Sequence, residues 1–188
     1  MSKAPKARRE IEAAYEHISN MESAETLEEF QKNWEHFLND ISRAWDKTTS
    51  YFKHKKEWNK INSKYKSILK NDPLLKYLKI ARNIEYHGIK EITEHQPATT
   101  TISSTPPKPG FKQPDGSTVI PAQELLKIRL DGPRVKLISL EDRGKTFHPP
   151  TTHRGKPIDQ NNIIEVAKKA ADFYQEVLQA AQTEINTD

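Results

Sequence analysis

The sequence predicts an all-α protein, an up-and-down helical bundle of four to five helices with an inserted β-hairpin and long loops before the last helix. Three observations lead to this fold class. Apolar side chains recur every three or four residues in five segments. The connections between the early segments are short, which favours antiparallel neighbours. From about residue 96 the composition shifts to threonine, serine and proline, which is typical of exposed loops.

The first two predicted helices are marked by apolar stripes and by one capping signal. The first covers about residues 6–21 and places Ile11 and Ile18 on one face. The second starts near Thr26, because Thr26 and Glu29 have the spacing of a capping box, in which each side chain accepts the other residue's backbone N–H. Its apolar stripe consists of Phe30, Trp34, Phe37, Leu38, Ile41 and Trp45.

The third and fourth predicted helices meet at an Asn-Asp-Pro sequence. The third contains Trp58, Ile61, Tyr65, Ile68 and Leu69, and its junction with the second helix, around residues 48–55, stays open. Asp72 is a good N-cap, and Pro73 suits the first helical position because the N–H that it lacks has no partner there. The fourth helix therefore begins at Pro73. We call it the motif helix.

The second half of the chain is expected to leave the bundle and return to it. Residues 96–116 should form an exposed loop. Candidate strands at residues 124–130 and 134–140 flank Asp131-Gly132-Pro133 and predict a hairpin. Residues 143–155 are interpreted as an irregular loop, and the last helix begins near Asp159. The predicted divisions are 1–95 (first part of the bundle), 96–157 (proline- and threonine-rich loop and hairpin insertion) and 158–188 (helix completing the bundle).

Composition excludes several classes of protein. With no cysteine, the chain has no disulfide, thiolate metal site or cysteine nucleophile. No apolar run approaches the roughly 18 residues of a membrane-spanning helix, and the basic N-terminus is not followed by an apolar stretch. We therefore expect a soluble, cytoplasmic protein that does not engage a membrane. Histidines 148 and 153 match no regular metal pattern, so we predict no metal site and no cofactor.

Charge is distributed unevenly along the chain. Between Arg43 and Arg82 twelve basic side chains face three acidic ones, whereas the segment from Asp159 onward is acidic. This asymmetry indicates either an anionic partner for the middle region or mutual attraction of the two segments. The lysines that we predict to bind an RNA backbone are Lys53, Lys55, Lys56, Lys60 and Lys79. The alternative is that they only form solvated helix faces.

The motif helix carries Arg82, Asn83 and His87 within two turns. Histidine moves protons near neutral pH, and arginine neutralises charge on a pentavalent phosphorus centre. Helical geometry aligns Asn83 with His87 and leaves Arg82 about 140° around the axis from His87. A site uniting them requires the guanidinium to curl back, the helix to distort near Gly88, or a second copy related by a two-fold axis.

The pattern Arg82-Asn83, three residues and then His87 resembles the signature of the HEPN superfamily. The resemblance implies a small all-α domain that works as a homodimer, with the motif near the interface. It also implies a metal-independent endoribonuclease that uses the ribose 2′-hydroxyl as nucleophile, with Arg82, Asn83 and His87 as catalytic residues. Many members are toxins or defence effectors.

A non-catalytic reading remains beside the ribonuclease, and whether this chain is an enzyme stays open. The insertion at 96–157 is not part of the minimal HEPN pattern. The alternative is a HEPN-like helical module that binds nucleotide, RNA or a cognate protein partner. In that case Arg82 pairs with Glu85, Asn83 is simply solvated, and His87 interacts with the helix dipole.

Overall fold

The computed structural model describes residues 4–86, 93–96, 99–103, 111–112, 114, 118–119, 127–131 and 134–185. These residues form two compact units, one from residues 1–94 and 135–188 and one from residues 95–134. The described part of the chain contains five helices: α1 (Pro5–Glu22), α2 (Leu27–Phe52), α3 (Trp58–Asn71), α4 (Pro73–Tyr86) and α5 (Ile163–Glu184). None of them is long and apolar enough to cross a lipid bilayer.

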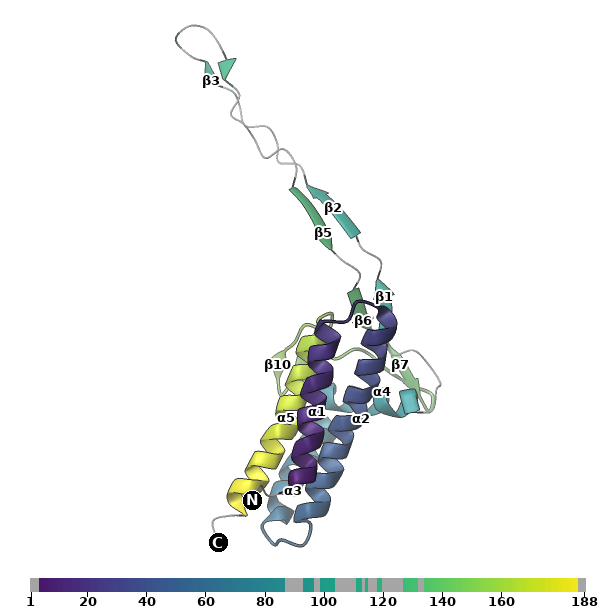
Figure 1. Cartoon of the computed structure of the whole chain (residues 1–188), viewed down its shortest axis with the longest axis vertical. Helices are drawn as coiled ribbons and strands as arrows, with labels where there is room; N and C mark the ends of the chain where they lie inside the picture. Colours follow the sequence, from purple (N-terminus) through teal and green to yellow (C-terminus); the bar gives the residue numbers. More distant parts are fainter. Residues whose placement is uncertain are drawn as a thin grey trace. The chain divides into compact units, whose positions relative to one another are not determined.

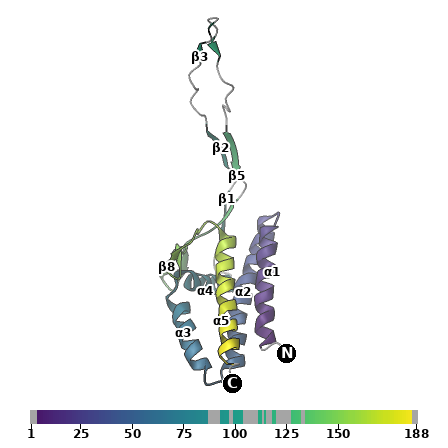
Figure 2. The same cartoon turned by 90° about the vertical axis from the view of Figure 1, so that its left-hand side faces the viewer.

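The helices of the first unit form the predicted up-and-down bundle, with β structure inserted before the last helix. Helices α1, α2 and α5 lie side by side and contact one another, and α3 packs against α4 and α5 (Figures 1 and 2). Large aromatic side chains fill the core, and Trp34, Phe37, Trp58 and Phe173 are each at most 1% exposed. The apolar stripes read from the sequence are thus the faces that the bundle buries.

The two predicted helix starts are confirmed at atomic level. The hydroxyl of Thr26 accepts the N–H of Glu29 at 3.1 Å, and the carboxylate of Glu29 accepts the N–H of Thr26 at 3.4 Å. Oδ1 of Asp72 accepts the N–H of Leu75 at 3.0 Å at the start of α4. Helix α2 continues for 26 residues to Phe52, so residues 48–52 of the open junction belong to α2.

The β structure consists of short two-stranded pairs. The strands are β1 (Thr93–Gln96), β2 (Thr99–Ser103), β3 (Phe111–Lys112), β4 (Thr118–Val119), β5 (Lys127–Asp131), β6 (Arg134–Leu137), β7 (Leu140–Asp142), β8 (Lys145–Phe147), β9 (Thr152–His153) and β10 (Lys156–Pro157). The pairs are β1 with β6, β2 with β5, β3 with β4, β7 with β8, and β9 with β10. The segment 96–116, predicted to be a loop, therefore contains β2 and β3.

The predicted hairpin between residues 124–130 and 134–140 is wrong. The two segments do contain strands, but β5 pairs with β2 and β6 pairs with β1. Proline chemistry explains why the two strands do not form a hairpin. A two-residue turn at Asp131-Gly132 would be closed by a hydrogen bond from the N–H of residue 133, and Pro133 has no N–H. The sequence signals therefore predicted the two strands correctly but not their pairing.

The predicted irregular loop at residues 143–155 is also wrong, because it holds parts of two hairpins. Arg143-Gly144 joins β7 to β8, and Arg154-Gly155 joins β9 to β10. All four of these residues have positive φ, from 49° to 75°, as two-residue type I′ turns require. Both hairpins belong to the first unit, and β7 and β9 contact α4. Residues 135–157 thus belong to the same compact unit as the helices.

Candidate functional site

Helix α4 is buried on most of its circumference. It contacts α2, α3 and α5 as well as β7 and β9. The buried side chains on it are Leu74, Leu75, Tyr77, Leu78, Ile80, Ala81 and Ile84. From residue 74 to residue 84 only Lys76 and Lys79 are exposed, and Arg82 and Asn83 are half-buried. Lys79 follows Lys76 by three residues, and Arg82 and Asn83 follow Lys79 by three and four; we call these four residues the α4 strip.

Two of the three predicted catalytic residues lie on this strip and contact each other. Nη1 of Arg82 donates a hydrogen bond of 3.3 Å to Oδ1 of Asn83. The guanidinium therefore turns toward the edge of the helix that carries Asn83. His87 lies outside the described residues, as does the side chain of Glu85. Neither the complete triad nor the alternative Arg82–Glu85 pair is therefore placed.

The β7–β8 hairpin lies beside the α4 strip and is fixed to helix α4. The hydroxyl of Tyr77 donates to the carbonyl oxygen of Ile138 at 2.8 Å, just before β7 begins. Burial raises the pKa of the Tyr77 hydroxyl far above its usual value, so it remains a donor. After β8, Nδ1 of His148 lies 2.9 Å from the Ser139 hydroxyl, which joins the two flanks of the hairpin.

The strip and the hairpin also meet through a cation and an aromatic ring. Nζ of Lys76 lies 5.4 Å from the centroid of the Phe147 ring on β8, within the range of a cation–π interaction. The Lys76 side chain is therefore held at the surface next to the hairpin. Neither Lys76 nor Phe147 was among the predicted site residues. The three-residue step from Lys76 to Lys79 was the only signal that could have found this lysine.

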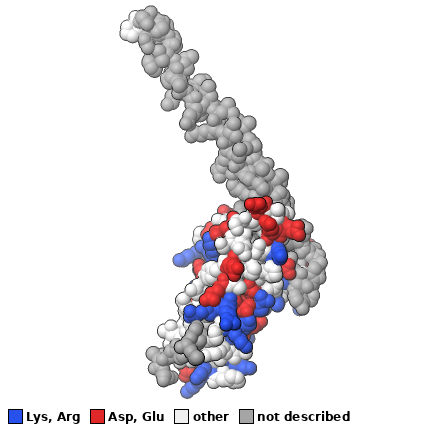
Figure 3. All heavy atoms as spheres, in the orientation of Figure 1, with Lys and Arg blue, Asp and Glu red and all other residues white. Residues whose placement is uncertain are grey.

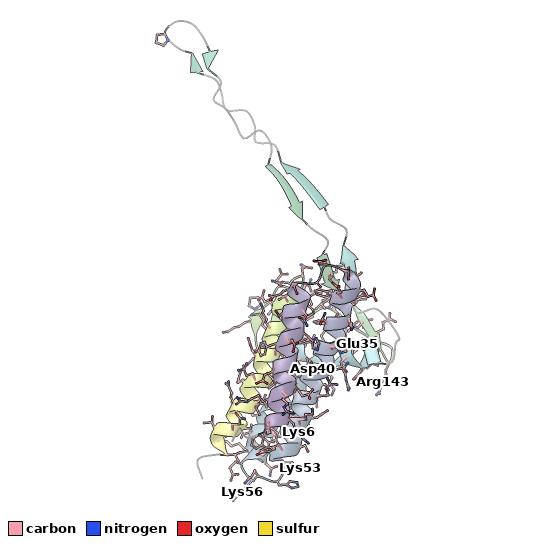
Figure 4. All side chains as sticks on the ribbon, viewed as in Figure 1. Lys6, Glu35, Asp40, Lys53, Lys56 and Arg143 are labelled. Carbon is pink, nitrogen blue, oxygen red and sulfur yellow. The ribbon has the colours of Figure 1, made fainter. Side chains whose placement is uncertain are left out.

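Four of the five predicted RNA-binding lysines gather at one end of the bundle. Lys53, Lys55, Lys56 and Lys60 are all exposed, in the α2–α3 connection and the first turn of α3. Among the described residues none of them forms an ion pair. Figure 3 shows basic side chains in both halves of this face of the bundle, and Figure 4 labels Lys53 and Lys56 at its lower end. We call these four residues the loop lysines.

The fifth, Lys79, is separated from the loop lysines by the fold. It lies on α4, which both ribbon views place away from the end where α2 passes into α3 (Figures 1 and 2). Arg143, at the tip of the β7–β8 hairpin, also lies well away from Lys53 and Lys56 (Figure 4). The first unit therefore presents two basic surfaces rather than one.

Two other basic residues of the hairpin region are engaged inside the first unit. His153 places Nδ1 at 3.0 Å from Oδ1 of Asp72, and the N–H of Arg154 donates to Oδ2 of Asp72 at 2.6 Å. The guanidinium of Arg154 donates to Glu176 of α5 at 2.5 Å. Both residues thus anchor the β9–β10 hairpin to the helices. Arg143 and Lys145 of the other hairpin are exposed.

Metal-ligand side chains do not gather in the part of the first unit that the structure describes. Within the described ranges no group of three or more histidine, aspartate or glutamate residues is arranged to hold a metal ion. The chain matches no family model, and comparison with curated proteins and with solved structures gives no match. We therefore infer function from the geometry and chemistry of the residues themselves.

Proposed function

We propose that the protein is a metal-independent endoribonuclease that works as a homodimer and cleaves RNA through Arg82, Asn83 and His87. The hydrogen bond between Arg82 and Asn83 is the observation that supports this proposal most directly. Asn83 precedes His87 by four residues, so a regular helix would carry both on one edge. Because the Arg82 guanidinium turns toward that edge, it lies closer to a site shared with His87 than the position of Arg82 around the helix axis alone would allow.

The reaction is a transesterification that needs no added nucleophile. The ribose 2′-hydroxyl gives its proton to one His87 and forms a bond to the adjacent phosphorus. The bond from phosphorus to the 5′-oxygen breaks, and that oxygen takes a proton from a second His87, supplied by the other copy. Arg82 stabilises the charge on the phosphorane. The products are a 2′,3′-cyclic phosphate and a 5′-hydroxyl, and a toxin or defence effector is the role that the HEPN resemblance implies.

The experiment incubates the purified protein with end-labelled structured RNA in excess chelator and identifies the product ends. Wild type should leave 2′,3′-cyclic phosphates. Removal of a general acid-base typically lowers the rate by about 10²–10⁴-fold, and removal of a charge-stabilising donor by about 10²–10³-fold. We expect losses of these sizes for His87→Ala and Arg82→Ala. Arg82→Lys keeps the charge but not the fork of donors, and should retain part of the activity.

Controls separate chemistry from folding. Each variant is checked for wild-type circular dichroism and oligomeric state, and a substrate with 2′-deoxyribose at every position is tested in parallel. Cleavage of the deoxy substrate at the same rate would contradict the proposed nucleophile. Full activity of His87→Ala would remove the histidine from the mechanism.

A second function, binding of RNA or nucleotide without cleavage, is favoured by the loop lysines. Four exposed lysines without ion pairs among the described residues create a surface that attracts phosphates. This module would also serve a cognate protein partner with an acidic surface. It predicts RNA binding that weakens steeply with salt, no cleavage of any RNA, and loss of binding when the loop lysines are replaced by glutamine.

A further inference from the structure

Between Leu74 and Ile84, the α4 strip holds the only side chains of α4 that are not buried. Seven side chains between Leu74 and Ile84 are buried, and the exposed positions 76 and 79 are both lysines. A helix with a broad apolar circumference is normally packed on all sides. Here packing leaves positions 76 and 79 open, and both side chains there are basic.

The positive charge of the two strip lysines is not paired among the described residues. Lys76 and Lys79 form no ion pair with any described residue, and the Lys76 ammonium lies 5.4 Å from the centroid of the Phe147 ring. The nearby β7–β8 hairpin carries Glu141 and Asp142, and these acids are matched in number by Arg143 and Lys145. The hairpin is therefore close to neutral, and the lysines of the strip remain as surplus charge.

The α4 strip runs along the helix toward the motif residues. Lys79 and Asn83 are four residues apart, and the same step from Asn83 reaches position 87. Phosphates bound at Lys76 and Lys79 would thus lie in a line that leads along α4 toward the proposed reactive centre. The β7–β8 hairpin, fixed by the Tyr77–Ile138 hydrogen bond, borders this line.

We infer that the α4 strip, bordered by the β7–β8 hairpin, is the track for the RNA backbone, and that the loop lysines are not. The inference rests on the proposed action on RNA and adds which surface holds the substrate. Lys76 and Lys79 neutralise phosphates next to the site of attack, and Phe147 keeps the Lys76 ammonium in place. The loop lysines lie at the end of the bundle where α2 passes into α3, away from α4 (Figures 1 and 2).

The test measures binding of a fluorescent single-stranded RNA that carries 2′-O-methyl groups and so cannot be cleaved. Three double variants are compared with wild type: Lys76→Gln with Lys79→Gln, Lys53→Gln with Lys56→Gln, and the matched control Lys66→Gln with Lys70→Gln. All six lysines are exposed, and each double variant removes two charges. For single strands each lost phosphate contact lowers the slope of log affinity against log salt by about 0.7.

We expect the strip variant to bind on the order of tenfold more weakly at 0.1 M salt, with its salt slope reduced by about 1.4. The control should stay within about twofold of wild type. If the Lys53 and Lys56 variant loses affinity while the strip variant does not, the track lies at the loop lysines and the inference is wrong. Equal losses in all three variants would show diffuse attraction, which also overturns it.

Failure of the inference and failure of the proposed function have different signatures. If wild type cleaves RNA and the strip variant binds and cleaves as well as wild type, the ribonuclease stands and the track is elsewhere. If wild type neither binds nor cleaves any RNA, both fall together. Circular dichroism and thermal melts of the variants exclude unfolding as a cause, because exposed lysines seldom affect stability.

Discussion

Nδ1 of His153 lies 3.0 Å from Oδ1 of Asp72, although the two residues are 81 positions apart in the chain. Only 3% of the Asp72 side chain and 11% of the His153 side chain are exposed. The same carboxylate caps α4 through the N–H of Leu75 and accepts the N–H of Arg154 in the β9–β10 turn. One buried aspartate therefore joins the start of the motif helix to a hairpin that covers it.

Replacing Asp72 should lower the free energy of unfolding by more than the loss of a helix cap alone. Loss of an N-cap lowers the free energy of unfolding by about 1 kcal/mol, and a buried donor left without an acceptor adds about 1–3 kcal/mol. We expect Asp72→Ala to lower the free energy of unfolding by about 2–4 kcal/mol, measured by urea denaturation. Asp72→Asn keeps an acceptor oxygen and should lose less. A loss below about 0.5 kcal/mol for Asp72→Ala would mean that the carboxylate holds nothing together.

The same carboxylate should make stability depend on pH in the acid range. Burial by itself would raise the pKa of Asp72, but the N–H groups of Arg154 and Leu75 and the ring of His153 outweigh it and lower that pKa below its usual value. A carboxyl with a lowered folded-state pKa contributes stability that is complete above its unfolded value, about 3.9, and that disappears as pH falls through the folded value.

The free energy of unfolding should therefore fall as pH drops below about 4. Asp72→Asn should flatten this part of the curve, as followed by urea denaturation at a series of pH values. Glu176, whose pKa the Arg154 guanidinium also lowers, is the comparison. Its side chain is 40% exposed, so Glu176→Gln should change the acid slope less. An unchanged slope in Asp72→Asn would assign acid sensitivity to other groups.

The features that the sequence predicted well are those whose partners are close in the chain. Thr26 and Glu29 are three residues apart, and Asp72 caps the N–H of Leu75 at the same distance. Apolar stripes are local in the same sense, because the helix itself brings their members together. The fold class followed from these signals. The contact between His153 and Asp72 has no such local signal, because it arises only when β9 packs on α4.

The pairing of the strands and the hairpins that cover α4 could not be predicted from the periodicity of apolar residues. Arg143-Gly144 and Arg154-Gly155 make type I′ turns, but the usual sequence signals for these turns are Asn-Gly and Asp-Gly. The hairpins that cover α4 were therefore missed. Of the candidate site, Arg82 and Asn83 are placed in contact, and the role of His87 stays a prediction.

The turn glycines offer a test of backbone strain without steric contact. Gly144 has φ +73°, and an added Cβ would meet no atom within 4 Å. Left-handed backbone costs about 1–2 kcal/mol for alanine, and alanine recovers about 0.4–1 kcal/mol through the less flexible unfolded chain. We expect Gly144→Ala to lower the free energy of unfolding by about 1 kcal/mol in urea titrations.

Gly155 provides the matched control, because it has φ +75° and equally open surroundings. Gly155→Ala should show the same cost, and Arg143→Asn should raise stability slightly, since asparagine tolerates left-handed backbone. Stabilisation by Gly144→Ala would mean that the turn adopts another conformation in solution.

Two neighbouring residues on α4 distinguish its core from its exposed strip. Leu78 is 1% exposed and Lys79 is exposed. Leucine and lysine have similar helix propensities, so changing either to alanine isolates the effect of burial. Leu78→Ala should lower the free energy of unfolding by about 2–5 kcal/mol, whereas Lys79→Ala should stay within about 0.5 kcal/mol of wild type.

Binding should respond in the opposite order. In the RNA titration Lys79→Ala should weaken affinity, and Leu78→Ala should leave the affinity of the folded fraction unchanged, measured at a temperature where it is still folded. If the buried side of α4 stabilises the fold and its exposed side binds RNA, the buried leucine should affect stability alone and the exposed lysine should affect affinity alone. If Lys79→Ala destabilises the protein as much as Leu78→Ala does, α4 has no free side, and the RNA track along it is ruled out.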